Sequence, residues 1–116
     1  MIRHLTEKGE ITISDNIFKN IAGIAATNCF GVKGMAYRSM TDGLVHLLRK
    51  EAMSKGVQVI YNEDGSISIQ LHIIVEHGIN ITTACRAIIG EVKYKVSKYT
   101  GVQVKNVDVC VDSVVL

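Results

Sequence analysis

Apolar and polar residues alternate most regularly between residues 67 and 76, and this alternation predicts a long strand with one buried face. One face would carry Ile67, Ile69, Leu71, Ile73 and Val75, and the other Ser68, Gln70, His72 and Glu76. Gly78 interrupts the pattern. Asn80 follows with a side-chain oxygen that can accept a hydrogen bond from the first free N–H groups of a helix.

From residue 81 the apolar residues recur at steps of three and four, which is the spacing of an amphipathic helix. The predicted stripe is Ile81, Cys85, Ile88, Val92, Val96 and Tyr99. Gly101 follows at the position of a left-handed C-terminal cap. A strand with one apolar face and a helix with one apolar stripe must pack together, because neither can hide its apolar surface alone.

The N-terminal half predicts another strand, helix and strand. Residues 1–8 are polar, and we expect them to form a flexible N-terminus. Residues 10–14 alternate and predict a short strand, and residues 32–38 predict a second one. Between them, Ser14, Asp15 and Asn16 are good N-cap residues for a helix that ends between residues 28 and 31. Ala22, Gly23, Ala25 and Ala26 would let this helix approach its neighbours closely.

The middle of the chain is more ambiguous. Leu44, Leu47, Leu48 and Ala52 have helical spacing, so residues 42–55 predict a helix or a partly ordered loop that stops at Gly56. Residues 57–62 predict a strand that Asp64-Gly65 joins to the long strand as a hairpin. Residues 102–116 also predict a strand, but the valines change from even to odd positions, so we expect a bulge near Asn106.

The predicted order is therefore β-α-β-(α)-β-β-α-β in a chain of 116 residues. This order favours an α+β fold with a mostly antiparallel sheet of three to five strands and the two main helices on one face. The length is that of one domain, which we place at residues 9–116.

Composition narrows the function classes. The net charge of +2 is too small to imply a nucleic-acid partner, so we expect no dedicated nucleic-acid binder. Three cysteines without close spacing are expected to be reduced thiols. The first ten residues lack the apolar core of a secretory signal, and no apolar run approaches the length of a membrane span. We expect a cytoplasmic protein whose membrane attachment, if any, is peripheral and through a partner.

The sequence offers no arrangement typical of catalysis. His72 and His77 would lie on opposite faces of a strand, and no cysteine is close in sequence to either, so we expect no metal site. Cys29 has no base near it in sequence, and no phosphate-binding glycine motif is present. The chain is therefore expected not to be an enzyme, with no catalytic residue and no cofactor.

Two surface features are candidates for binding. Gly31-Val32-Lys33-Gly34 matches the G-x-x-G loop with which KH domains clamp a nucleic-acid backbone, although it is also typical of a tight turn from helix to strand. The outer face of the last helix carries Arg86, Lys93 and Tyr94, together with Gly90, Ser97 and Lys98. This face could bind an acidic protein partner, or it could be an ordinary solvated helix surface.

The order of these segments resembles that of a known family. The opening GEITIS precedes a helix with I-A-x-x-A and a G-V-x-G-M turn, and a strand pair leads into V-E-x-G. The closing helix runs into YTGVQVKNVDVCV. This arrangement resembles the alkaline shock protein family of Gram-positive bacteria, also called the envelope stress response family, over about residues 9–112. The shared positions Gly9, Ile13, Ala22, Gly34, Gly56, Gly78 and Gly101 then look like fold determinants.

The resemblance implies a non-enzymatic cytoplasmic protein of stress response and cell-envelope homeostasis. Members of that family associate with themselves and reach the membrane through a small membrane-anchored partner. Short single-domain members are also encoded beside a dihydroxyacetone-kinase-like protein, so the resemblance leaves a kinase-like partner equally open. No catalytic or cofactor residue comes with the family.

Overall fold

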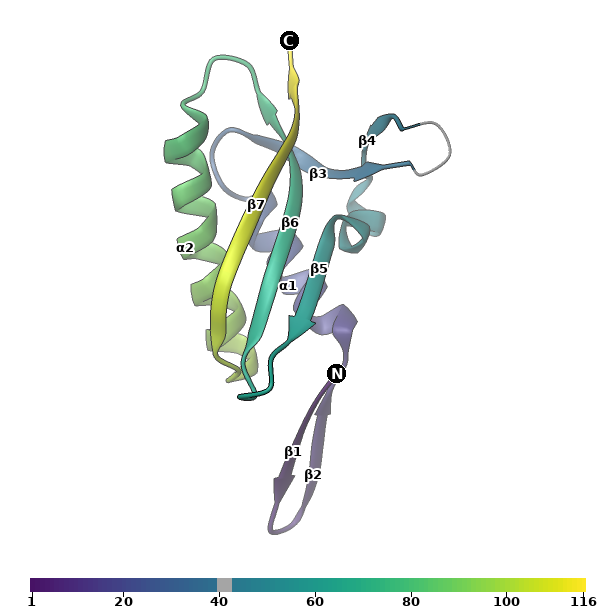
Figure 1. Cartoon of the computed structure of the whole chain (residues 1–116), viewed down its shortest axis with the longest axis vertical. Helices are drawn as coiled ribbons and strands as arrows, with labels where there is room; N and C mark the ends of the chain where they lie inside the picture. Colours follow the sequence, from purple (N-terminus) through teal and green to yellow (C-terminus); the bar gives the residue numbers. More distant parts are fainter. Residues whose placement is uncertain (40–42) are drawn as a thin grey trace.

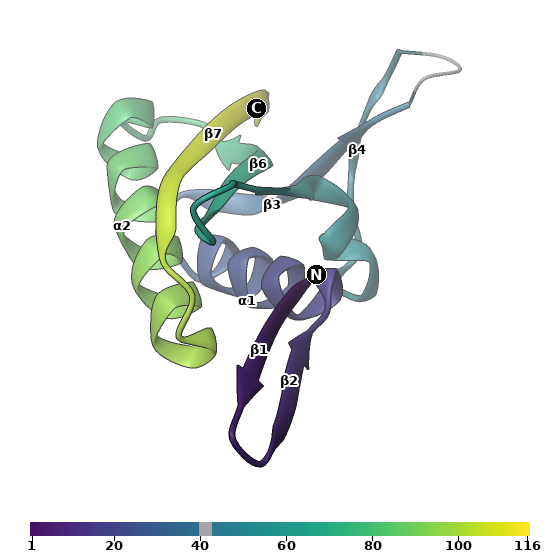
Figure 2. The ribbon, with the colours of Figure 1, turned by 60° about the horizontal axis from the view of Figure 1, so that its bottom comes forward.

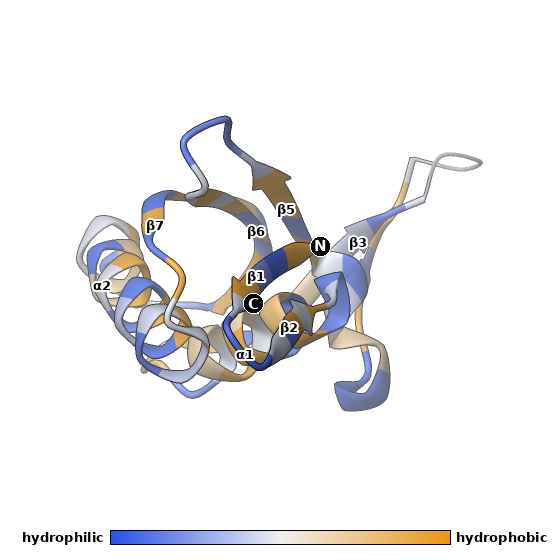
Figure 3. Cartoon of the chain, turned by 90° about the horizontal axis from the view of Figure 1, so that it is seen from below, coloured by the Kyte–Doolittle hydropathy of each residue, from blue (hydrophilic) through white to orange (hydrophobic). Residues whose placement is uncertain are grey.

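The segment with the regular alternation is strand β6 (Ile67–Glu76), which lies at the centre of a five-stranded sheet (Figure 1). In this computed structural model, which describes residues 1–39 and 43–116, the odd-numbered apolar side chains of β6 are all buried. Hydrophobic and hydrophilic residues alternate visibly along the strand (Figure 3). The predicted strand and its buried face are confirmed.

Both edges of β6 are occupied. Strand β7 (Val104–Val115) pairs with it in parallel along its whole length. On the other edge, β5 (Val57–Tyr61) pairs with the first half and β3 (Val32–Arg38) with the second half, both antiparallel. The short strand β4 (Val45–Leu47) extends the sheet beyond β3. The mostly antiparallel sheet is confirmed, and its one parallel pair joins the strands on either side of the last helix.

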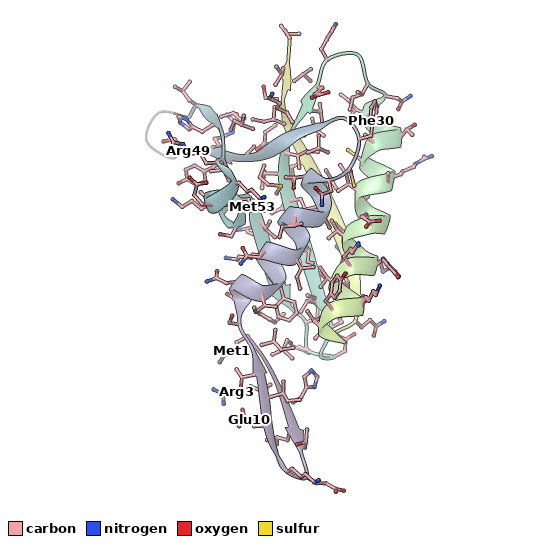
Figure 4. The ribbon with its side chains drawn as sticks, turned by 180° about the vertical axis from the view of Figure 1, so that it is seen from behind. Met1, Arg3, Glu10, Phe30, Arg49 and Met53 are labelled. Atoms are coloured by element: carbon pink, nitrogen blue, oxygen red, sulfur yellow. The ribbon has the colours of Figure 1, made fainter. Side chains whose placement is uncertain are left out.

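Helices α1 (Asp15–Thr27) and α2 (Ile81–Thr100) cover the same face of this sheet, as Figure 4 shows from the helical side. Ile88, Val92 and Val96 of the predicted stripe are fully buried in α2. The two ends of the stripe differ from the prediction, because Ile81 and Tyr99 are exposed. Tyr99 lies at the rim of the groove between α1 and α2. The predicted layer of two helices on one face is confirmed.

The small residues of α1 allow close packing, as the sequence predicted. Ala22, Ala25 and Ala26 are buried against the core, and Gly23 lies beneath Met53 (labelled in Figure 4). A Cβ atom at Gly23 would lie 2.9 Å from the Met53 sulfur, which is closer than atoms normally approach. Met53 belongs to the 3₁₀ helix η1 (Lys50–Gly56), which therefore rests directly on the α1 backbone.

The sequence left residues 42–55 open between a helix and a partly ordered loop, and the described part of this stretch is helical only from Lys50; residue 42 lies outside the described residues. This stretch contains strand β4 and then the 3₁₀ helix η1. The reason is tertiary: the Leu48 N–H donates to the Met35 carbonyl at 2.9 Å, and the Leu47 side chain covers Gly34. These contacts with β3 outweigh the helical spacing of the leucines.

Residues 1–8 were expected to carry no regular structure, whereas Ile2–Thr6 forms strand β1. It pairs antiparallel with β2 (Gly9–Ile13), the strand predicted from the alternation of residues 10–14. The resulting hairpin projects away from the body of the molecule (Figures 1 and 2). Ile2 and Ile13 at its base pack against the core.

The predicted ends of α2 and the predicted bulge are confirmed. The Asn80 side chain accepts a hydrogen bond from the Thr83 N–H at 3.0 Å, and Gly101 is left-handed with φ 73°. The register between β6 and β7 shifts between Val104 and Asn106, where the phase of the valines changes. A second shift, at residue 112, was not predicted.

Replacing Asn80 with Ala should destabilise the protein by about 1 kcal/mol, because the Thr83 N–H loses its partner. Urea unfolding followed by circular dichroism measures this change. Asn20→Ala is the matched control, because Asn20 is an exposed residue within α1, and the substitution should leave stability unchanged or slightly higher. Equal stabilities of the two variants would contradict the capping role.

The start of α1 is held by an interaction that the sequence did not predict. Ser14 occupies the N-cap position but its side chain makes no capping bond, whereas the Asp15 carboxylate accepts a hydrogen bond from the Tyr61 hydroxyl. This hydrogen bond lowers the pKa of Asp15, and so does the Met1 amino group, whose nitrogen lies 3.1 Å from the Asp15 Oδ1. Burial and the same bond raise the pKa of Tyr61. The Tyr61 ring also meets Phe18 edge-on at 6.4 Å between centroids.

Tyr61→Phe should raise the Asp15 pKa toward its ordinary value, because the hydroxyl donor is removed while the ring stays. A carboxyl group with a lowered folded pKa contributes stability above its unfolded pKa and loses it as the pH falls through the folded value. The variant should therefore be less stable than the parent at neutral pH. The difference should shrink once Asp15 is protonated in both. The tests are an NMR titration of Asp15 and unfolding curves at neutral pH and at a pH low enough to protonate Asp15 in both proteins. An unchanged Asp15 pKa would contradict the prediction.

Candidate interaction surfaces

The outer face of α2 presents an exposed stripe on the side away from the sheet. Its members fall in two neighbouring rows along the helix, and within each row they follow at steps of three or four residues. They are Arg86, Gly90, Lys93, Tyr94 and Lys98, which are exposed, and Ser97, which is half-buried. Both hydrophobic and hydrophilic residues occur around the circumference of α2 (Figure 3). Since Ile88, Val92 and Val96 anchor one side in the core, this stripe must face outward.

A shallow hollow of about 510 Å³ lies in the middle of this stripe. It is lined by Gly90, Lys93, Tyr94, Ser97 and Lys98. Its floor is bare backbone, because Gly90 has no side chain and a Cβ atom there would meet no other atom within 4 Å. We call this the Gly90 hollow. It is a place where another molecule can approach the α2 backbone without displacing any side chain.

The rim of the Gly90 hollow combines two lysines with the aromatic ring of Tyr94. The Lys98 ammonium lies 5.5 Å from the centre of the Tyr94 ring and 5.6 Å from that of Tyr99. Such contacts contribute about 0.5–1 kcal/mol at an exposed site. Lys95 is paired with Glu91 at 3.7 Å. Within the described residues no ion pair involves Lys93, so its charge is available to a partner.

The three predicted partner-binding residues differ in where they lie relative to the Gly90 hollow. Lys93 and Tyr94 both line the Gly90 hollow. Arg86 is exposed about one helical turn before Gly90, on the same stripe but outside the lining. No ion pair with Arg86 occurs in the part of the chain that the structure describes. It extends the positive charge of the stripe toward the start of α2.

The Gly31–Gly34 loop has a structural explanation for both glycines. Gly31 is left-handed with φ +87°, and a Cβ atom there would lie 2.7 Å from Ile79. A Cβ atom at Gly34 would lie 2.8 Å from Leu47. The loop leads from α1 into strand β3, whereas a KH loop lies between two helices. Lys33 is exposed, but the nucleic-acid hypothesis receives no support, and the segment is the tight helix-to-strand turn.

The face of the sheet opposite the helices carries a ladder of polar pairs that the sequence analysis did not find. Contacts join Asn62 to Ser68 (3.1 Å), Ser68 to Asn106 (2.8 Å), Gln70 to Cys110 (3.7 Å) and His72 to Asp112 (3.0 Å). Alternation placed Ser68, Gln70 and His72 on the polar face of β6. The partners on β7 could not be found, because they depend on the parallel pairing and its shifted register.

The three cysteines, Cys29, Cys85 and Cys110, are free thiols that are half-buried. Across residues 1–39 and 43–116, no three His, Cys, Asp or Glu side chains are grouped so that they could hold a metal ion. Burial raises the pKa of the Cys29 thiol, with a smaller effect of Glu91, and also that of Cys85. Among the described helices, none is both long and apolar enough to cross a membrane.

Residues 3–116 match the model of the alkaline shock protein 23 family, which is described as having a cell envelope-related function. The chain belongs to this alkaline shock protein family. The match confirms the resemblance to the alkaline shock and envelope stress proteins and extends it over nearly the whole chain. The matched region includes the N-terminal hairpin from residue 3, the Gly90 hollow and the polar ladder.

Proteins similar to this family member occur in Gram-positive bacteria. The chain is 39% identical over 110 residues to the uncharacterized protein YloU of Bacillus subtilis (strain 168), covering 94% of this chain and 91% of that protein. It is 34% identical over 110 residues to Spy1614 of Streptococcus pyogenes serotype M6, covering 94% and 90%. These proteins are therefore similar to this one over most of their lengths.

Among solved structures, the fold is similar to that of MamM-CTD. The TM-score is 0.52, and the superposition covers 86% of this chain and 99% of that one. The sequences are only 15% identical. This likeness therefore shows that this member of the alkaline shock protein family shares a fold with MamM-CTD, and it carries no functional assignment.

Replacing Gly90 with Ala should stabilise the protein by about 0.5–1 kcal/mol, because glycine inside a helix loses more conformational freedom on folding and no atom obstructs the new methyl group. Thermal unfolding should show a melting temperature a few degrees higher. Gly101→Ala is the matched comparison and should do the opposite, since its φ of 73° disfavours alanine. A destabilised Gly90→Ala variant would show that Gly90 is needed for folding.

Proposed function

We propose that this protein is a non-enzymatic scaffold of the cell envelope that associates with itself and binds a protein partner through the outer face of α2. The observation that carries the proposal is the Gly90 hollow, with its bare backbone floor and its rim of lysines and Tyr94. The cell envelope-related description of the alkaline shock protein family supports the setting.

The chemistry of the hollow favours a protein segment with acidic side chains. A glycine in the exposed middle of a helix lowers stability by about 1 kcal/mol relative to alanine, so its presence is explained if a partner needs close approach to the helix. Tyrosine combines an apolar ring with a polar tip and is enriched where proteins meet. Lys93 and Arg86, which lack ion pairs within the described chain, complement carboxylates and would steer their approach.

Two kinds of partner, both implied by the family resemblance, fit this surface if they present an acidic segment. One is a small membrane-anchored protein, and the other is a kinase-like protein. In either case the scaffold is cytoplasmic and reaches the membrane only through its partner. The basic stripe of α2 would face that partner.

The test starts with capture of partners from the native host by the tagged protein, with and without detergent and nuclease, followed by identification by mass spectrometry. The affinity for the captured protein is then measured by calorimetry. Lys93→Glu should weaken binding about tenfold, because like charges would meet at the rim. Tyr94→Ala should weaken it about thirtyfold if the ring is a central anchor. Arg86→Glu should act mainly on the association rate and its salt dependence.

Lys33→Glu is the matched control, because Lys33 is an exposed lysine at the start of β3, outside α2, and its replacement should leave the affinity unchanged. Unaltered binding by the Lys93→Glu, Tyr94→Ala double variant would refute docking at the Gly90 hollow. Capture that disappears on nuclease treatment and is lost in Lys33→Glu would instead favour the nucleic-acid hypothesis.

A further inference from the structure

The N-terminal hairpin of β1 and β2 is an incomplete structure by itself. Each strand has five residues, and in the described chain the hairpin packs against the body through Ile2 and Ile13 at its base and projects from there (Figures 1 and 2). An isolated two-stranded hairpin is marginally stable in water, and three or more strands with an apolar face are needed for independent stability. In the hairpin, Leu5 is 84% exposed and Ile11 is 55% exposed. Apolar surface and two free strand edges therefore extend into solvent.

The two faces of the hairpin differ in chemistry. Directly paired residues share a face, so Ile2 and Ile13 lie with Ile11 and His4 on one side. The other side carries Arg3, Leu5, Glu10 and Thr12. Arg3 and Glu10 extend from the same side in Figure 4, and their charged groups are 3.7 Å apart. One face is thus isoleucine-rich, and the other already has its charges paired.

We propose that this hairpin is a dimerisation arm, in which β2 pairs antiparallel with β2 of a second copy of the chain. The inference rests on the self-association part of the proposed function and names the segment responsible. The two hairpins together form a four-stranded sheet in the order β1-β2-β2-β1. This completes the sheet that a single hairpin lacks.

The sequence of β2 is complementary to itself in this register. With Ile11 on the two-fold axis, it lies opposite the partner's Ile11, and Gly9 lies opposite the partner's Ile13. Gly9 has no atom within 4 Å of the position of a Cβ, so it leaves room for the large isoleucine side chain. Glu10 lies opposite the partner's Thr12, and each Glu10 keeps its own Arg3 close by.

The alternative pairing of β1 with β1 is less favourable. It would place His4 opposite the partner's His4 and Arg3 opposite the partner's Leu5. Pairing through β2 instead gathers Ile2, Ile11 and Ile13 from each copy on one face of the four-stranded sheet. Cross-strand pairs of β-branched residues are the contacts that stabilise sheets, and the β2 pairing therefore uses the hairpin's apolar side best.

The shape of the molecule permits this contact. Antiparallel pairing places the base of one hairpin beside the tip of the other, so the two bodies lie at opposite ends of the shared sheet. A five-residue strand spans about 17 Å, which keeps the bodies apart. The base is fixed by the packing of Ile2 and Ile13 and by the bond from Tyr61 to Asp15. Each arm therefore projects in a defined direction.

The decisive variant is Ile11→Lys, measured by sedimentation velocity of the full chain over a range of concentrations. Two lysines would face each other at the two-fold axis, so the dissociation constant of the dimer should rise roughly a hundredfold. Ile60→Lys is the matched control: Ile60 is also a strand isoleucine that is 55% exposed, but it belongs to β5 on the body. It should associate as the parent does.

Mixing Ile11→Lys with Ile11→Glu shows whether the loss comes from the contact or from a damaged hairpin. Opposite charges would then face each other, so heterodimers should form where neither variant associates alone. Unimpaired association of Ile11→Lys, or no recovery in the mixture, would overturn the arm while leaving self-association intact. A parent chain that stays monomeric at every concentration would overturn both the dimerisation arm and self-association. Docking of a partner at the Gly90 hollow would still be decided by the Lys93 and Tyr94 variants.

Discussion

Strand β6 imposes the constraint on which the rest of the structure depends. It buries Ile67, Ile69, Leu71, Ile73 and Val75 on one face, and full burial of such a side chain is worth about 1.5–3 kcal/mol. Two helices must therefore lie on that face. The strand also needs neighbours on both edges, and β5 and β3 share one edge because each is shorter than β6. The chain between them has to turn outward, which produces β4 and η1.

Features that depend on local pattern could be predicted from the sequence. The alternation of β6, the caps of α2 and the bulge near Asn106 each follow from a few adjacent residues. Features that depend on distant contacts could not. The leucines before Gly56 have helical spacing, but their positions are decided by β3, through Met35 and Gly34. The pairing of residues 2–6 likewise depends on a second strand, β2. The parallel pairing of β7 with β6 depends on the helix that connects them.

The candidate interaction surfaces show the same difference between features set by local sequence and features set by distant contacts. Helical periodicity alone was enough to place Lys93 and Tyr94 beside Gly90, because residues three and four apart in a helix lie on the same side. The Gly31–Gly34 motif was ambiguous because glycine serves both ligand contact and backbone packing. Only the neighbouring Ile79 and Leu47 side chains show that packing accounts for it here. The polar ladder required knowledge of which residues of β7 lie opposite β6.

Two parts of this protein depart from what stability alone favours, namely the glycine in the exposed middle of α2 and the apolar hairpin that leaves the body. Departures of this kind are expected where a chain serves a function. They lie on different elements, and the hairpin projects from one end of the molecule while α2 flanks the sheet (Figure 1). Binding at one therefore need not block the other. A dimer joined through its arms would present two Gly90 hollows, and two linked sites can raise the apparent affinity for a clustered partner by about 10²–10⁴-fold. Each Gly90 hollow would then need only a weak affinity for its partner, because the dimer could bind two copies of a partner that is concentrated at the envelope.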